Sequence, residues 1–493
     1  MTQTNPGNIS AGNTIRVALL TCTIVLSMTL LYLLPALYNG FPLVFPDTAG
    51  YLVGHTPNRS LGYYIFNRIF DMRVSPWPGI VLQSLIVSWT IWQFVSALFN
   101  IADFPRMFLL AAFLTVATSL PWFVSWIMPD IFTALMILAL VLLCFAWDAL
   151  PRLSKIILVM LIGAALAFHQ ANLPVALWMF PALGLCALLG WRPSRPFLHG
   201  FFASGIGLTL GVVAMLTLNL VSGQVGLSRS GSVTLLARML EDGTALSYLQ
   251  QTCPRQHFAV CADLNELKSY NSVHPYPQAY PQNTLYNYFL YEGPLEKLGG
   301  YPGEEAEASA IVRGTLLMYA PAQFRASVDN GWRQLLVFST GADIFAYSDK
   351  SWISTAILNR FGPAVYEKYR HSEQNSNNFD FQTGLPRPVK TIGIVDFSLI
   401  SRVDAGVVAA SSLLLIGFLI LPWAKKQLRS FYATITTTTM VVGNAFMLGA
   451  LSRPVDRYQG RVIWLVPLLA GCFVLNRAIY LKHLKQNGRA LEV

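Results

Sequence analysis

The sequence predicts a polytopic α-helical membrane protein with about ten transmembrane helices and a mainly α periplasmic domain inserted between helices 7 and 8. Three observations lead to this fold class. Hydrophobic residues make up 54% of the 493 residues and charged residues only 12%, whereas a soluble domain carries roughly one quarter charged residues. Apolar stretches of about twenty residues recur along the chain, and that length crosses a bilayer as a helix. One long segment between them returns to a soluble composition.

Ten apolar stretches have the length expected of a transmembrane helix. They lie near residues 17–38, 79–99, 107–126, 130–147, 156–170, 173–190, 200–221, 403–423, 431–451 and 461–479.

The short connections between these stretches predict their orientation. Basic residues occur in every second connection, so they all fall on the same side of the predicted membrane. They include Arg16, Arg106, Arg152, Arg192 and Arg429. Because basic residues are retained on the cytoplasmic side, we expect both the N-terminus and the C-terminus in the cytoplasm. The same loops account for the net charge of +10. The basic residues form no stripe, so we expect no nucleic-acid partner.

Two segments on the outer side are longer than a simple turn requires. The first is the loop 40–78, and the second is the stretch 223–402, where polar residues return to soluble-like frequency. We therefore divide the chain into an N-terminal seven-helix membrane module (1–222, including the first loop), a periplasmic domain (223–402) and a C-terminal three-helix membrane segment (403–493).

The periplasmic domain is expected to be helical and to carry a disulfide. Helical patterns cover Ser232–Asp242 and Glu304–Leu336, the second broken or kinked at Pro321. Cys253 and Cys261 are the two cysteines of this domain, and the periplasm favours disulfides. We expect them to be bridged, because a metal site built on them and the histidine between them would lack a fourth ligand.

The ionisable residues point to a site where the helices meet water. The central portions of the ten stretches carry none, whereas proton-coupled transporters place such groups at mid-bilayer depth. Polar residues collect instead at the outward helix ends. The candidate site residues are Asp47, Arg59, Asp130, His169, Arg453, Arg457 and Arg461.

Three of these candidates each have a structural and a functional interpretation. Asp47 follows Pro46, and an aspartate there acts either as a helix N-cap or as a catalytic base. Asp130 directly precedes an apolar helix, so it is a capping candidate as well as a candidate for metal or substrate binding. His169 lies at a helix end, where it either bonds to a backbone carbonyl or contacts substrate.

Arg453, Arg457 and Arg461 are spaced four residues apart, which places them on one face of a helix. Guanidinium groups arranged in this way bind phosphate bidentately. The alternative is contact with lipid headgroups. We favour phosphate binding, because three arginines on the outer side are not explained by anchoring alone.

Short motifs resemble known membrane proteins. The acidic residue after the first helix, the enlarged first outer loop, the Pro129-Asp130 step and the large outer domain are similar to the GT-C superfamily of lipid-sugar-dependent glycosyltransferases. More closely, residues 39–48, 128–133 and 236–243 resemble an uncharacterised group of proteobacterial inner-membrane proteins.

The resemblance implies a function and a location. We expect a multi-pass enzyme of the bacterial inner membrane that moves a sugar at the periplasmic face from a polyprenyl-phosphate-linked donor to a lipid or glycan acceptor. In the superfamily the first-loop acid is the base or a metal ligand, and this carries over to Asp47. Many members have a second acidic pair, but here only Asp130 is present, so no cofactor is assigned and a divalent metal on Asp47 and Asp130 stays open.

Two alternatives from other classes remain. One is a transporter of lipid-linked glycans, and the other is a membrane scaffold whose periplasmic domain binds a partner. The sequence does not identify the sugar, the acceptor, the prenyl chain length or the oligomeric state.

Overall fold

The structure is a computed structural model of the chain and describes residues 11–54, 59–223, 226–228, 230–274, 284–341, 344–347, 351–376, 387–388, 390–421 and 427–486. The N-terminal part contains the helices α1 (Ala11–Tyr32), α2 (Leu34–Asn39), α3 (Thr48–Val53), α4 (Leu61–Phe70), α5 (Trp77–Phe99), α6 (Phe104–Ala117), α7 (Leu120–Ser125), α8 (Ile131–Ala146), η1 (Trp147–Ala149), α9 (Arg152–Phe168), α10 (Asn172–Leu177), α11 (Met179–Leu188) and α12 (Arg195–Val221).

The middle of the chain contains α13 (Gly231–Glu241), α14 (Thr244–Thr252), η2 (Ala259–Asp263), α15 (Leu264–Val273), α16 (Leu285–Tyr291), α17 (Pro294–Lys297), α18 (Gly300–Leu336), α19 (Trp352–Phe361), α20 (Pro363–Arg370) and α21 (Glu373–Ser376). Short antiparallel pairs join β1 (Phe345–Ala346) to β2 (Arg387–Pro388) and β3 (Thr391–Ile392) to β4 (Val395–Asp396). The C-terminal helices are α22 (Phe397–Ile420), α24 (Leu428–Leu451), α25 (Asp456–Ile463) and α26 (Leu465–Gln486).

The protein is a helical membrane protein. Among the described residues, seven helices are long and apolar enough to cross a bilayer. They cover Ile15–Tyr32, Trp77–Phe99, Ile131–Ala149, Arg195–Val221, Phe397–Ile420, Leu428–Leu451 and Asp456–Ala478.

The other three predicted stretches form shorter or interrupted helices. The stretch 107–126 is divided between α6 and α7, and 173–190 between α10 and α11. The stretch 156–170 belongs to α9, whose 17 residues span about 25 Å. Each interruption coincides with a residue that weakens helix continuity: Pro121 in the first turn of α7, and Pro181 near the start of α11.

Helix α8 forms the centre of the bundle. Every residue of α8 is buried, and the helix packs against α5, α9, α12 and α24. A helix that is hydrophobic on all sides has to be surrounded by other helices. The N-terminal end of α8, where Asp130 lies, is therefore held in a fixed position within the bundle.

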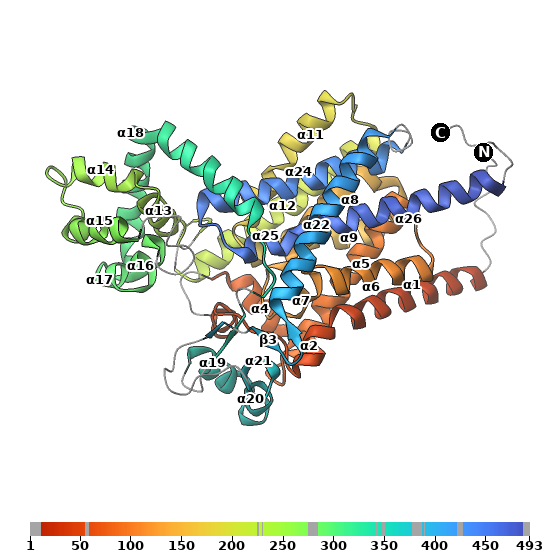
Figure 1. Ribbon diagram of the computed structural model, residues 1–493, viewed down its shortest axis with the longest axis horizontal. Helices are drawn as coiled ribbons and strands as arrows, with labels where there is room; N and C mark the ends of the chain where they lie inside the picture. The colour runs from red at the N-terminus through yellow and green to blue at the C-terminus, as the bar shows by residue number, and fades with distance from the viewer. Residues whose placement is uncertain are drawn as a thin grey trace.

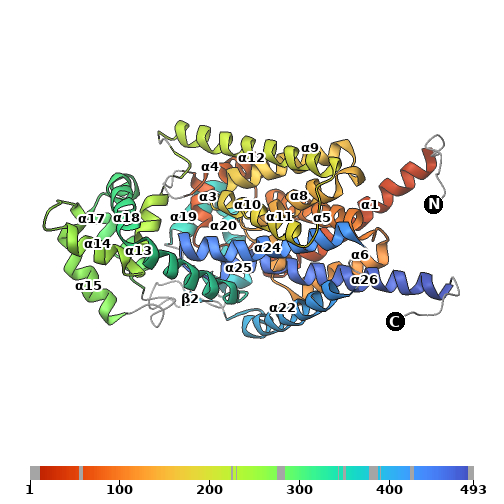
Figure 2. The ribbon, with the colours of Figure 1, turned by 90° about the horizontal axis from the view of Figure 1, so that it is seen from above.

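The two ends of the bundle differ. In both ribbon views α13–α17 lie at one end of the molecule, while α1 begins and α26 ends at the other (Figures 1 and 2). We call these the lobe end and the terminal end.

The segment expected as one periplasmic domain has two hydrophobic clusters. Helices α13–α18 share the first cluster, and α18 continues along α24 of the bundle. Helix α18 is kinked at Tyr319, two residues before Pro321, so the predicted interruption is present. The second cluster joins α19 and α20 to residues of the first loop. A buried ion pair between Arg360 and Asp71, at 2.8 Å, connects the same two segments.

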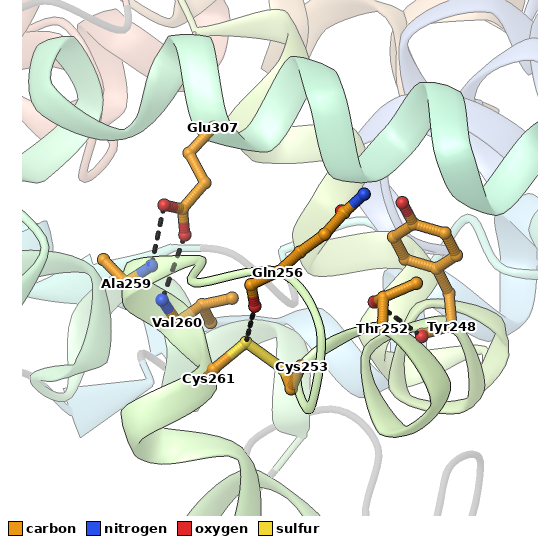
Figure 3. Close-up of a disulfide and its surroundings, with 8 residues drawn as sticks. All are labelled: Tyr248, Thr252, Cys253, Gln256, Ala259, Val260, Cys261 and Glu307. Atoms are coloured by element: carbon orange, nitrogen blue, oxygen red, sulfur yellow. Dashed lines mark hydrogen bonds between the residues drawn. A yellow bond between two sulfur atoms is a disulfide. The ribbon is translucent and has the colours of Figure 1, made fainter.

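A disulfide closes the loop after α14. The sulfur atoms of Cys253 and Cys261 are bonded, as the sequence predicts. Glu307 of α18 accepts hydrogen bonds from the backbone N–H groups of Ala259 and Val260, at 2.7 and 3.0 Å (Figure 3). The bridge and the glutamate together fix this loop against α18.

An ion-pair cluster at the lobe end of the bundle

Four segments bring five charged side chains together at the lobe end. Asp47 precedes α3, Arg59 precedes α4 and Asp130 precedes α8, while Arg457 and Arg461 belong to the first and last turns of α25. We call these five residues the ion-pair cluster. Six of the seven candidate site residues lie in or beside it; Arg453 is the exception.

Asp47 is held by two arginines. One carboxylate oxygen pairs with Arg59 Nη2, and the other lies 2.8 Å from Arg457 Nη1. Asp47 occupies the N-cap position of α3, but its side chain makes no capping hydrogen bond. The capping interpretation therefore does not describe Asp47, whose carboxylate connects the first loop to α25.

Asp130 extends the cluster into the bundle. Its side chain is 1% exposed, and Oδ1 lies 3.4 Å from Arg461 Nη1 and 3.8 Å from Arg457 Nε. The side chain makes no capping bond, although the positive end of the α8 dipole still favours a carboxylate at this position. Its second oxygen, Oδ2, is buried without a hydrogen-bond partner among the described residues, so the site has an unsatisfied acceptor.

Arg461 is fully buried and has several neighbours. Nη2 donates to Asn444 Oδ1 at 3.1 Å, and the guanidinium lies 5.6 Å from the Tyr458 ring centre. Its Nε has no hydrogen-bond partner among the described residues. Because Arg461 faces the bundle interior, it contributes charge to the site without being open to solvent.

Arg457 lies between Asp47 and the aromatic ring of Phe45. Its guanidinium carbon is 4.3 Å from the Phe45 ring centre, a cation–π geometry. The ring and the Asp47 carboxylate fix the orientation of this guanidinium.

The expectation of three arginines on one helical face is wrong for Arg453. Helix α25 begins at Asp456, so Arg453 lies in the connection before it. Pro454 explains this, because a residue before proline is pushed out of the helical region. Arg453 lies instead over the Tyr286 ring, at 5.5 Å, beside the α13–α18 lobe. Only Arg457 and Arg461 share the predicted face.

His169 lies at the edge of the cluster as a neutral side chain. Burial lowers its pKa to about 3, and the nearby Arg461 contributes in the same direction. Its Nδ1 accepts a hydrogen bond from the Ala171 backbone N–H at 3.3 Å. This nitrogen is therefore an acceptor and does not make the expected hydrogen bond to a backbone carbonyl. The histidine does not add positive charge to the site at neutral pH.

The cluster has an excess of positive charge. Burial raises the pKa of Asp47, but Arg59 and Arg457 outweigh it and lower the pKa to about 2. Three guanidinium groups then face two carboxylates, which leaves one positive charge. A partly buried positive excess favours an anion, because the charge is weakly screened by water.

A cavity adjoins this excess charge. The cavity is small, with a volume of about 10 Å³, which is room for about one water molecule. The polar part of its lining is Arg59, Ser60, Gln170 and Asn219, and the apolar part is Met215, Leu218 and Leu227. The lining therefore combines a guanidinium with apolar side chains, of which Met215 and Leu218 belong to α12.

The residues present do not fit a divalent cation. Asp47 and Asp130 are both paired with arginine, and a cation would be repelled by the three guanidinium groups around them. In the part of the chain that the structure describes, no group of three or more His, Cys, Asp or Glu side chains could hold a metal ion.

Sequence reasoning missed Asn444 and Tyr458. Asn444 donates to the Tyr458 backbone carbonyl at 2.7 Å and accepts from Arg461. An asparagine inside the apolar stretch 431–451 is a detectable signal, because a buried amide in a membrane helix needs partners.

Comparison with protein-family models, curated proteins and solved structures finds no match to this chain.

Proposed function

We propose that the protein transfers a glycosyl group from a polyprenyl-phosphate-linked donor to an acceptor hydroxyl at the lobe end of the bundle. The observation that carries this proposal is the Asp47 carboxylate held between Arg59 and Arg457, next to a cavity with polar and aliphatic walls. Guanidinium groups that can bind a phosphate and a carboxylate that can act as a base thereby lie at one site, at the end of membrane helices. This is also the activity that the sequence resemblance implies.

The chemistry needs no covalent enzyme intermediate. The bond between the anomeric carbon and the phosphate oxygen breaks, and the acceptor oxygen bonds to the same carbon from the opposite face, inverting it. Asp47 accepts the proton of the acceptor hydroxyl. The guanidinium groups of Arg59 and Arg457 stabilise the charge that develops on the leaving phosphate.

Asp47 must lose one partner before it is an effective base. A carboxylate whose pKa is about 2 holds a proton poorly at neutral pH. Arg59 lines the cavity, which has room for about one water. The cavity has to widen for a donor phosphate to bind there, and the phosphate then competes with Asp47 for this guanidinium. The carboxylate oxygen released from Arg59 becomes more basic, because an attractive charge has been removed. Donor binding and activation of the base would thus be one event.

We also propose that the chain crosses the membrane ten times, with both termini cytoplasmic and the lobe in the periplasm of a bacterial inner membrane. Contacts at the ends of the three shorter helical segments support the proposal. After α6, Ser119 donates to the Gly460 carbonyl at 2.7 Å beside Arg461. Helix α9 runs from Ser154, bonded to Gln93, to His169. The α10–α11 segment runs from Asn172, bonded to Thr133, towards Leu189, which accepts a bond from Tyr432.

The orientation rests on charge. Arg429 pairs with Asp148 at 3.6 Å and Lys155 lies over Trp147, away from the ion-pair cluster. These basic residues collect at the terminal end, and basic residues are retained in the cytoplasm.

Glycosyl transfer in reconstituted vesicles tests the function. Asp47→Asn keeps the size of the side chain but removes the base, so turnover should fall by about 10²–10⁴-fold. Asp103→Asn is the matched control, because Asp103 also pairs with an arginine, Arg106, and caps α6 at its N-terminus. Asparagine caps about as well as aspartate.

A second candidate function is binding without chemistry, as in a transporter of lipid-linked glycans or a scaffold. The complete pairing of Asp47 with two arginines favours it, because such a network also serves as a structural connection between the first loop and α25. Full transfer activity in Asp47→Asn would establish this alternative as the better account.

A further inference from the structure

The first loop carries an exposed apolar surface that faces neither the bundle nor the lobe. The surface consists of Ile65, Ile69, Phe70, Met72 and Val74, of which Met72 is 73% exposed and Val74 67% exposed. Ile65 and Ile69 are four residues apart on α4 and therefore share one face of the helix. A contiguous apolar surface of this kind marks a contact with a partner or a lipid.

The opposite face of α4 is fixed to the membrane bundle. Tyr63 is buried and donates to Gln83 Oε1 at 3.1 Å, and Gly62 approaches the Ala167 carbonyl at the end of α9 so closely that a Cβ would collide with it. The helix therefore cannot turn its apolar side chains inward.

These contacts also define how deep α4 lies. Gln83 belongs to the second turn of α5, which begins at Trp77, so it lies about 9 Å along that helix. Helix α4 is consequently level with the first turns of a spanning helix. Helices at the bilayer surface bury their apolar face about 5–10 Å into the boundary between headgroups and acyl chains.

The charges on this surface have one sign. Arg68 and Arg73 are exposed, whereas the carboxylate of Asp71 is buried and paired with Arg360. Lipid phosphates attract exposed arginines, while a typical protein surface presents both signs of charge.

The turn after α4 holds its side chains outward under strain. Met72 and Arg73 have φ angles of 50° and 60°, which residues other than glycine rarely adopt. Asp71 Oδ1 accepts from the Arg73 N–H at 2.9 Å and stabilises this conformation. Strain of this kind persists where the surroundings maintain it, and it is concentrated at functional sites.

We propose that the segment Ile65–Val74 inserts into the lipid–water interface of the leaflet next to the lobe. Ile65, Ile69 and Met72 contact the acyl chains, and Arg68 and Arg73 bind lipid phosphates. Helix α4 packs against α12, a spanning helix that has exposed apolar side chains of its own. The bilayer that surrounds α12 therefore comes close to this surface. The inference does not depend on glycosyl transfer.

A fluorophore at Ile69 tests the proposal. Ile69→Cys is prepared in a Cys22→Ser background, because Cys22 is the one exposed free cysteine among the described residues. It is labelled with an environment-sensitive dye and reconstituted into phosphatidylcholine vesicles with or without phosphatidylglycerol. We expect blue-shifted emission and quenching by lipids that carry a shallow nitroxide. Ser247→Cys, on the exposed side of α14, is the control and should report water.

Two outcomes would overturn the proposal. Emission at Ile69 that matches the Ser247 control would mean that the surface faces water. Blue-shifted emission without quenching by nitroxide lipids would mean that another protein or a second copy covers it.

Adding Arg68→Glu and Arg73→Glu should weaken the quenching most in phosphatidylglycerol vesicles, and no change there would contradict the phosphate contacts.

Discussion

At the scale of single residues, the chemistry of Asp47 depends on its partners. The carboxylate is 410 residues away from Arg457 in sequence, yet the two are 2.8 Å apart. This pairing stabilises the ionised acid and at the same time suppresses its basicity. A ligand that removes a guanidinium therefore changes what Asp47 can do.

Asp47 should contribute to stability in a pH-dependent way. Because its folded-state pKa is lowered to about 2, the stabilisation is fully present above the unfolded-state pKa of about 4 and is lost as pH falls through 2. Its size should be on the order of 2 kcal/mol. The melting temperatures of detergent-solubilised wild type and Asp47→Asn should differ at pH 6 and converge between pH 4 and pH 2. A difference that is independent of pH would contradict the ion pairing.

Arg457→Lys should weaken donor binding although the charge is kept. Lysine has no planar fork to contact a phosphate bidentately or to stack on Phe45. We expect donor affinity to fall about tenfold in an equilibrium binding assay, as for the loss of a charged hydrogen bond. Arg106→Lys at the other end of the bundle is the control and should bind normally. Unchanged donor affinity in Arg457→Lys would instead mean that Arg457 contributes only its positive charge.

At the scale of elements, short breaks in helices decide which charges meet. Pro454 delays the start of α25 until Asp456, which separates Arg453 from Arg457 and Arg461. Asp130 lies beside Arg461 at the N-terminal end of α8, and its position is fixed because every residue of that helix is buried.

The Cys253–Cys261 bridge should stabilise the lobe and leave membrane insertion unchanged. Closing a loop with a sequence separation of 8 contributes roughly 2–3 kcal/mol in the chain-entropy estimate. The double Ser variant should be cleaved faster in the lobe during limited proteolysis while it is recovered in membranes at the wild-type level. Cys22→Ser serves as the control. Equal cleavage rates would show that Glu307 and the surrounding packing hold the loop without the bridge.

The sequence predicts the elements better than it predicts the site. Long apolar stretches are detectable because the bilayer imposes both length and composition on a helix. The stretches 107–126 and 173–190 depart from the single helices that the sequence predicts, since prolines divide them into shorter helices. Asp47, Asp130 and Arg457 are candidates because they lie at predicted helix ends, but no local pattern shows that the two carboxylates pair with the arginine. Their pairing depends on the tertiary packing of α3, α8 and α25.

At the scale of the whole molecule, the proposed topology places the ion-pair cluster on the side opposite the basic loops. Ser247→Cys, on the lobe, should react in intact cells with a thiol reagent that does not cross the membrane. Pro193→Cys, in the exposed connection before α12, should react only after the membrane is opened. We expect this result because basic residues flank position 193. The reverse pattern would place the ion-pair cluster on the cytoplasmic side and would contradict the proposed orientation.

The central claim is that Asp47 and a donor phosphate compete for the same guanidinium groups. Binding of farnesyl phosphate to the purified protein measures this without knowledge of the sugar or the acceptor. Asp47→Asn removes the internal anion, so it should bind the phosphate on the order of tenfold more tightly than wild type. Asp103→Asn should be unchanged, and Arg59→Gln should bind weakly. Equal or weaker binding by Asp47→Asn would contradict the account, because the cluster would then be a structural network that no phosphate enters.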